Sequence, residues 1–202
     1  MLGKSVLSLG LVIAALVGMG CANMSGGRGN GATYRTVAVE PGRDTEAAKR
    51  ANEAGLEHLA KGEIEQAAKA FERALTADVE FGPAHNNLGR VYFKQKDWYK
   101  AAWEFEYAGK LLPKHAAPRN NLGLVFEEVG QLDRAVEYYR EAVNLDPENI
   151  QYRSNLCRAL VRRGDRTSEV RNLLERMLQQ DDRPEWRVWA KRQQVRIGAQ
   201  SD

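Results

Sequence analysis

Asparagine recurs at a fixed interval in this 202-residue chain. One series is evenly spaced and consists of Asn87, Asn121 and Asn155, and we call its spacing the repeat interval. A second series has the same spacing, lies one position earlier, and consists of Asn52, Asn86, Asn120 and Ser154. A side-chain amide offers both a hydrogen-bond donor and an acceptor, so a row of amides can hold the backbone of an extended peptide. We therefore expect these side chains to line a peptide-binding surface.

A row of aromatic residues is a second candidate contact surface. Tyr99, Trp103 and Tyr107 lie four residues apart, which places them on one face of a helix. The positions one repeat interval before and after this row are all charged, namely Glu65, Lys69, Arg73, Asp133, Glu137 and Glu141. Aromatic side chains on a face that otherwise meets water usually mark a contact. Three occupants stay open: a partner protein, residues 34–39 of the chain itself, and a second copy in a homodimer.

Residues that could perform catalysis or bind a metal form no recognisable pattern in the sequence. The three histidines lack metal-ligand spacing, and the two cysteines, Cys21 and Cys157, suit neither a metal site nor a disulfide framework. No nucleophile stands with a base, and no phosphate-binding glycine loop is present. The net charge of +3 is too small to favour nucleic acid. We expect a non-enzyme without cofactor, metal or nucleic-acid partner, whose function lies in its binding surfaces.

Both candidate surfaces fall within a unit that repeats at this same interval. Seven framework residues recur at that distance, pairing Leu88, Gly89, Tyr92, Ala101, Phe105, Ala108 and Pro113 with Leu122, Gly123, Phe126, Ala135, Tyr139, Ala142 and Pro147. The apolar residues have helical spacing, and each unit is long enough for two helices and a turn. The predicted units are residues 48–81, 82–115, 116–149 and 150–183, with a capping helix at 184–197 and a disordered tail at 198–202.

This register resembles the tetratricopeptide repeat family, whose units have the same length of about 34 residues. The resemblance implies an all-α domain over residues 45–197, a right-handed superhelix of antiparallel helix pairs. It also implies that the first helix of each pair lines a concave groove that binds proteins or peptides. The groove would hold the two asparagine series together with Arg90, Phe93, Leu124, Glu127 and Arg158, and the aromatic row would lie on the convex side.

The family pattern bears on the groove at two places, the asparagine positions and the carboxylate clamp. Asparagine is common at the Asn87 position of the family, where it can bond the neighbouring backbone instead of a ligand. The family also has a clamp for a C-terminal carboxylate, and here Gln151 and Asn155 stand where its final basic pair belongs. The resemblance therefore implies a peptide groove without that clamp.

Glycine and cysteine at framework positions are expected to serve packing. Gly55, Gly89 and Gly123 are costly inside a helix, so each needs a packing reason, and we expect close approach of the alanines of the second helix. Those alanines are Ala67, Ala101 and Ala135. Cys157 takes the same place in the fourth unit and is predicted to be a small core residue.

The chain begins with a predicted export signal, residues 1–20. Lys4 supplies a positive start, and residues 6–19 form an uncharged, mostly apolar run that is typical of a signal peptide and short for a membrane span. The run leads to Gly20 and Cys21, which resemble the end of a bacterial lipoprotein signal. An uncleaved membrane anchor and a plain secretory signal are the alternatives.

The lipoprotein resemblance implies that Cys21 becomes the first mature residue and carries the lipid, which anchors the chain in a membrane. It also implies a bacterial cell envelope location, and Ala22 favours the outer membrane facing the periplasm. Residues 21–44 are rich in glycine at their start and are expected to form a flexible tether.

Together these features predict a lipid-anchored adaptor or scaffold. The combination resembles small repeat lipoproteins that help assemble pili or secretion complexes. Two alternatives remain: an adaptor for peptidoglycan hydrolases or proteases, and a non-catalytic subunit of an enzyme encoded separately.

Overall fold

The computed structural model describes residues 43–199, and every element in this range is a helix. The helices are α1 (Thr45–Ala60), α2 (Ile64–Ala77), α3 (Gly82–Lys94), α4 (Trp98–Leu111), α5 (Ala116–Glu128), α6 (Leu132–Leu145), α7 (Ile150–Arg163), α8 (Ser168–Gln180) and α9 (Pro184–Gly198). The all-α prediction is confirmed. The predicted export signal, Cys21 and nearly all of the predicted tether lie outside the described residues.

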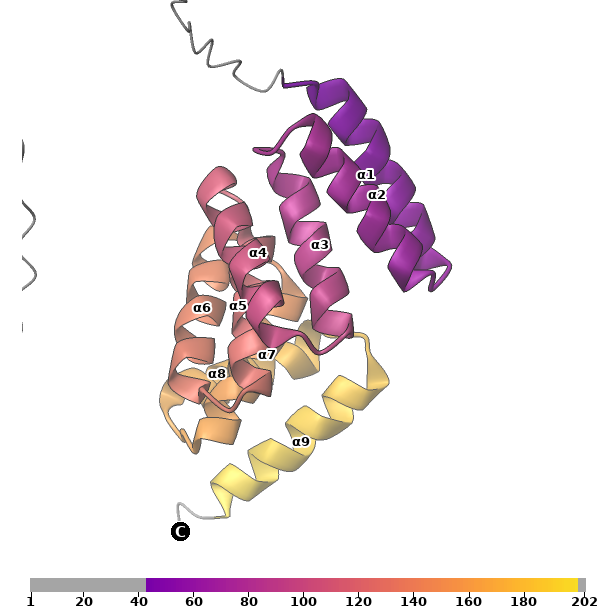
Figure 1. Cartoon of the computed structure of the whole chain (residues 1–202). Helices are drawn as coiled ribbons and strands as arrows, with labels where there is room; N and C mark the ends of the chain where they lie inside the picture. Colours follow the sequence, from indigo (N-terminus) through magenta and orange to yellow (C-terminus); the bar gives the residue numbers. More distant parts are fainter. Residues whose placement is uncertain (1–42, 200–202) are drawn as a thin grey trace, which may run out of the picture. The chain divides into compact units, whose positions relative to one another are not determined.

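Eight of the helices form four pairs that pack in sequence order, from α1 with α2 to α7 with α8 (Figure 1). The first helices of the second, third and fourth pairs begin at Gly82, Ala116 and Ile150, a constant step equal to the repeat interval. Each first helix also contacts the first helix of the next pair, as α3 contacts α5 and α5 contacts α7. The repeat register therefore appears directly as a stack of equivalent helix pairs.

The turn inside each pair requires one residue in the left-handed backbone region. Gly62, Gly130 and Gly164 provide it with φ of 78°, 78° and 100°. These glycines pay no steric cost for that conformation because they lack a Cβ. In the second pair the same place is filled by Lys96, whose φ is 62°. The second pair is thus the one whose turn carries a side chain in a strained conformation.

The framework glycines let an aromatic ring of the second helix lie against the first helix. A Cβ built on Gly89 would stand 2.6 Å from the ring of Phe105, and one on Gly123 would stand 2.5 Å from the ring of Tyr139. Gly55 has the same relation to Phe71, at 2.4 Å. These glycines do allow close packing of the paired helix, as expected, but the group that approaches them differs from the expected alanine. The partner is the aromatic ring, while the alanines lie buried nearby.

The last helix, α9, covers the end of the stack. It packs against α8, and its Ala190 and Ile197 are buried in the core cluster that also contains Leu160 and Leu174. Trp186 and Trp189 pack at the edge of that cluster, which agrees with the predicted capping role.

Cys157 is fully buried in the same cluster, as predicted. Burial, together with the negative charge of Glu169, raises the pKa of its thiol to about 12. The thiol is therefore protonated and unreactive at neutral pH. Among residues 43–199, no helix is long and apolar enough to cross a membrane.

Candidate protein-binding surfaces

The two asparagine series meet between neighbouring first helices. Asn87 donates from its side-chain nitrogen to the side-chain oxygen of Asn52 at 2.8 Å. Asn121 donates to Asn86 at 2.9 Å, and Asn155 donates to Asn120 at 2.8 Å. Each bond joins residues 35 positions apart, so the two series combine into one ladder of amide pairs along α1, α3, α5 and α7. We call this side of the stack the first-helix surface.

Burial separates the members of this ladder into two groups. Asn52, Asn87, Asn120 and Asn155 are buried, and their amides hold neighbouring first helices together. The expectation that these four contact a peptide directly therefore changes to a structural role. The alternative expectation was that the Asn87 series bonds the neighbouring backbone. In the structure the side-chain nitrogens of this series instead donate to other side chains.

The pair of Asn86 and Asn121 is only half-buried. The oxygen of Asn86 accepts from Asn121, and the N–H groups of Asn86 have no acceptor within the described residues. Ser154, which completes the series in the fourth pair, is buried and donates to Asp181 at 3.0 Å. Peptide contact thus stays a prediction for Asn86 and Asn121.

A buried carboxylate stands at the centre of the first-helix surface. Glu127 of α5 accepts from the hydroxyl of Tyr139 at 2.7 Å and from both Nε and an Nη of Arg158 at 2.8 and 2.6 Å. It also accepts from Arg162 at 2.7 Å. We call these four residues the Glu127 cluster. Burial raises the pKa of Glu127, but the hydrogen bonds and charge of Arg158, with Tyr139 and Arg162, more than offset this and leave the pKa below its usual value.

The Glu127 cluster carries one more positive than negative charge. Its Glu127 side chain is 3% exposed, whereas that of Arg162 is 49% exposed and can still meet a ligand. Arg158 lies over the ring of Trp186 at 5.2 Å, and Arg183 approaches the same ring at 4.9 Å. The fourth pair therefore gives this surface a positive character.

The remaining predicted groove residues lie beside these groups. Arg90 is exposed and donates to Asn87 at 3.1 Å, so its guanidinium lies beside the amide ladder on α3. Phe93 is half-buried and packs edge-on against Trp98 at 5.1 Å between ring centroids. Leu124 is half-buried and packs against the main core cluster. The structure thus places these residues on α3 and α5, next to polar groups of the same helices.

The aromatic row lies on α4 and is open to solvent. Tyr99 is 82% exposed and Trp103 is 53% exposed, and both belong to the exposed large apolar residues of the described range. Tyr107 is half-buried, and its ring is nearly parallel to that of Trp103 with centroids 5.6 Å apart. Tyr99 and Trp103 therefore present an apolar surface to solvent, whereas Tyr107 is partly covered by its neighbours.

Behind the row stands a buried ionisable pair that the sequence reasoning missed. The Nδ1 of His85 lies 2.6 Å from a carboxylate oxygen of Glu104, and its Nε2 donates to the carbonyl of Val79 at 2.8 Å. The imidazole also packs edge-on against Tyr107, with centroids 4.6 Å apart. The signal was available at the repeat interval, because Glu104 stands where the flanking units carry Ala70 and Tyr138.

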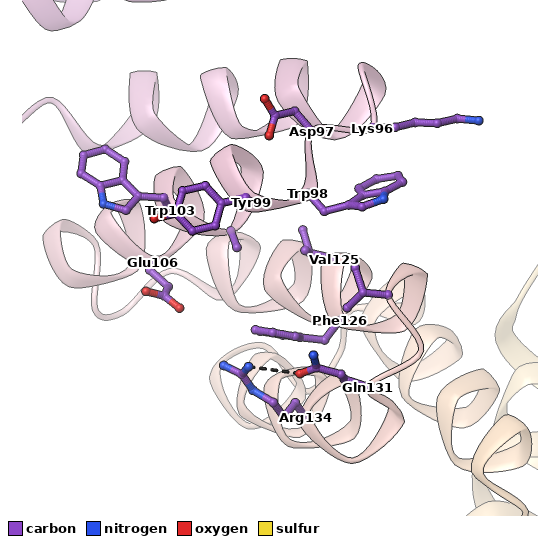
Figure 2. A pocket seen from close by; sticks show the side chains of 12 residues that line it. Lys96, Asp97, Trp98, Tyr99, Trp103, Glu106, Val125, Phe126, Gln131 and Arg134 are labelled. Carbon is purple, nitrogen blue, oxygen red and sulfur yellow. Dashed lines mark hydrogen bonds between the residues drawn. The ribbon is translucent and has the colours of Figure 1, made fainter.

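An open groove of about 840 Å³ begins at the other end of the row. Figure 2 shows Trp98, Tyr99 and Trp103 along one side and Phe126 with Arg134 along the other. The guanidinium of Arg134 lies 3.7 Å from the centroid of the Phe126 ring and donates to Gln131 at 3.2 Å. The strained Lys96 also lines the groove. Departures from the repeat pattern therefore gather on one side of the second pair.

Comparison with known proteins identifies the repeats. One tetratricopeptide repeat model matches residues 52–116, and a second matches residues 116–149. The anaphase-promoting complex subunit 3 of Schizosaccharomyces pombe is 26% identical over 107 residues. That match covers 53% of this chain and 16% of the relative, so the chain spans only a small part of that protein's length.

Solved structures share the superhelical fold. The first repeat domain of Spaghetti (RPAP3), bound to the HSP90 peptide SRMEEVD, has a TM-score of 0.58 at 19% identity and matches 61% of this chain and 98% of its own. YrrB, a repeat protein described as having an unusual peptide-binding site, has a TM-score of 0.60 at 23% identity. It matches 74% of this chain and 76% of its own. At these identities the likeness establishes the fold and no more.

Proposed function

We propose, on the premise that residues 52–149 of this chain are tetratricopeptide repeats, that the chain is an adaptor that binds partner proteins through its first-helix surface. Repeat domains of this kind offer extended surfaces made by successive helices. The described residues contain no group of three side chains suited to hold a metal ion. The proposed binding role is argued from the side-chain groups that the first-helix surface presents to a ligand.

The observation that carries the proposal is the alignment of half-buried amides with exposed guanidinium groups. Asn86 has side-chain N–H groups without an acceptor among the described residues; Arg90 stands on the same helix, α3, and Arg162 stands on α7, next to the helix that carries Asn121. An extended peptide needs such donors for its carbonyls, and an acidic side chain on it would pair with the guanidinium groups. The surface therefore suits an extended segment that carries an acidic side chain.

A C-terminal carboxylate is a poorer fit than an internal acidic segment. Gln151 and Asn155 occupy the places where the family's carboxylate clamp has its final basic pair, and Asn155 is already bonded to Asn120. The Spaghetti domain binds an HSP90 peptide, and YrrB is described as having an unusual peptide site. Among such ligands we favour an internal segment of the partner for this chain.

We further propose that Cys21 carries a lipid and fixes the repeat domain to a membrane of the bacterial envelope. The support is the sequence alone: an apolar run of signal-peptide length that ends directly before Cys21. In that setting the adaptor would recruit components of a pilus or secretion complex. Labelled lipid should appear on the full chain and be absent from its Cys21→Ser variant, and equal labelling of both would refute the anchor.

Crosslinking tests the first-helix surface. A photoreactive residue replaces Asn121 in the full chain, and a matched control carries it at Asn144, which is exposed on the second helix of the same pair. We expect one defined partner to be captured from position 121 and not from position 144. Reversing the charge of the exposed Arg162, as Arg162→Glu, should reduce that capture at least about tenfold because a charged pair is lost.

Two outcomes would contradict the proposal. Equal capture from positions 121 and 144 would mean that the contacts are nonspecific. Capture from position 121 that is unchanged by Arg162→Glu would show that the partner binds without the positive groups that the proposed recognition requires.

A further inference from the structure

We propose that the outer face of α9 binds the headgroups of anionic lipids, so that this helix lies along a membrane surface. The outer face is the side of α9 that turns away from the core, and it presents two exposed valines and four exposed cations: Val188, Val195, Arg187, Lys191, Arg192 and Arg196. These side chains lie outside the first-helix surface, so the inference goes beyond the proposed adaptor role. It also does not require the proposed lipid on Cys21.

The core and the valines lie on opposite sides of α9. Ala190 and Ile197 are seven residues apart, are buried in the main core cluster, and hold the helix against the end of the stack (Figure 1). Val188 and Val195 have the same separation, so they also lie above one another on one face. Each valine precedes one of the buried residues by two positions, which is about 200° around a helix. The valines therefore form a short apolar ridge in solvent, with Val188 50% and Val195 67% exposed.

Two rows of positive charge border this ridge. Lys191 and Arg192 lie between the two valines along the helix, and the rotation of about 100° per residue places them on either side of the ridge. Arg187 is four residues before Lys191, and Arg196 is four residues after Arg192, so each extends one row. The outer face therefore has apolar groups at its centre and cations at both edges.

The charges of these rows are not neutralised within the described residues. There the side chains of the four cations form no ion pair and no hydrogen bond, and Glu185 is the single acidic residue of α9. By contrast, Arg158 and Arg162 of α7 both pair with Glu127. Like charges four residues apart on a helix repel each other. Anions bound along the two rows would relieve this repulsion, so the face is complementary in charge to an anionic surface.

A lipid bilayer offers both kinds of group that this face requires. Its headgroups supply phosphates for the cations, and the acyl boundary just beneath them accepts apolar side chains. Long arginine and lysine stems let the charged ends stay at the phosphates while the valine ridge enters deeper. Single-stranded nucleic acid would instead stack on exposed rings, but Trp186 and Trp189 pack at the edge of the core cluster. An anionic lipid surface is therefore the occupant that charge and apolar contact favour together.

Fluorescence quenching at α9 in the full chain tests the inference. A fluorophore is attached through Val195→Cys in a Cys21→Ser background, where Cys157 is buried and stays unlabelled. The vesicles carry a nitroxide at the headgroup and contain either phosphatidylcholine alone or phosphatidylcholine with phosphatidylglycerol. We expect quenching to be at least about twofold stronger on the vesicles with phosphatidylglycerol, because their negative surface attracts the two rows. The same fluorophore at Asn144→Cys, an exposed position on α6, should show no such difference.

Charge reversal separates the effect of α9 from that of the net charge of the protein. Lys191→Glu with Arg192→Glu should abolish the difference between the two kinds of vesicle. Lys69→Glu with Arg73→Glu on α2 is the matched control, because it also reverses two exposed cations and should leave the difference intact. All four altered residues are exposed, so thermal unfolding of both variants should stay close to that of the parent.

The fluorophore at position 195 also separates the alternatives. Attachment of another part of the chain to vesicles does not produce the expected pattern, because quenching is compared between positions and between lipid compositions. Equal quenching on both kinds of vesicle, quenching on neither, or a difference that survives Lys191→Glu with Arg192→Glu overturns the proposal. If polyglutamate changes the fluorescence at position 195 and anionic vesicles do not, the face is assigned to an acidic protein instead.

Discussion

The second and third repeats share one framework and differ in where they bury a carboxylate. Leu88 and Leu122 are equivalent core residues, and Gly89 and Gly123 each admit an aromatic ring of the paired helix. The second repeat buries Glu104 on α4, where it meets His85. The third buries Glu127 on α5, where it meets Tyr139, Arg158 and Arg162.

The equivalent positions show that neither repeat carries the buried carboxylate of the other. Glu127 corresponds to Phe93 in the second repeat, and Glu104 corresponds to Tyr138 in the third. A buried carboxylate needs hydrogen bonds and a counter-charge, so each one fixes the neighbours around it. The third repeat is therefore specialised on the first-helix surface and the second on the side that carries the aromatic row. Equal frameworks can thus present different surfaces.

The largest effect is expected at the shared framework. Leu122→Ala removes a fully buried side chain and should lower the free energy of unfolding by about 2–5 kcal/mol through lost apolar contact and a residual cavity. Leu88→Ala should cost a similar amount if the two repeats are equivalent. Chemical denaturation measures both, with Leu145→Ala as a control because Leu145 is exposed on α6. A loss at Leu122 no greater than at Leu145 would show that the register is misassigned.

A smaller effect, and one confined to the third repeat, is expected at Glu127. Glu127→Gln weakens hydrogen bonds to two guanidinium groups and should cost about 1.5–3 kcal/mol at neutral pH. The exposed Glu128→Gln is the control on the same helix and should be nearly neutral.

The Glu127 prediction also has a pH dependence. The pKa of Glu127 is lower in the folded protein than its usual 4.5. The carboxylate therefore contributes stability above about pH 4.5, and this contribution is lost as the pH falls through the lower folded-state pKa. The difference in unfolding free energy between the parent and Glu127→Gln should shrink across that acid range. A constant difference from neutral to acid pH would mean that the ionised carboxylate is not what stabilises the cluster.

The sequence predicted the framework better than the surfaces for a physical reason. Apolar residues at the repeat interval mark equivalent positions such as Leu88 and Leu122, so they predict the helix pairs. The amide bonds join residues one position further apart, such as Asn52 and Asn87, and follow from how the first helices stack. Spacing alone could reveal that Glu104 departs from the pattern, but its pairing with His85 depends on the packing of α3 against α4.

The smallest effect is expected at the turn of the second repeat, and it has the opposite sign. Lys96 has a φ of 62°, where the equivalent Gly62 and Gly130 have 78°. A side chain in this left-handed conformation costs about 1 kcal/mol, so Lys96→Gly should stabilise the protein by up to about that amount. Lys96→Ala is the control, because it removes the charge and keeps the Cβ. The reciprocal Gly130→Lys should destabilise the third repeat by a similar amount. If Lys96→Ala stabilises as much as Lys96→Gly, the charge and not the backbone separates the two turns, and strain is no longer part of what distinguishes the second repeat.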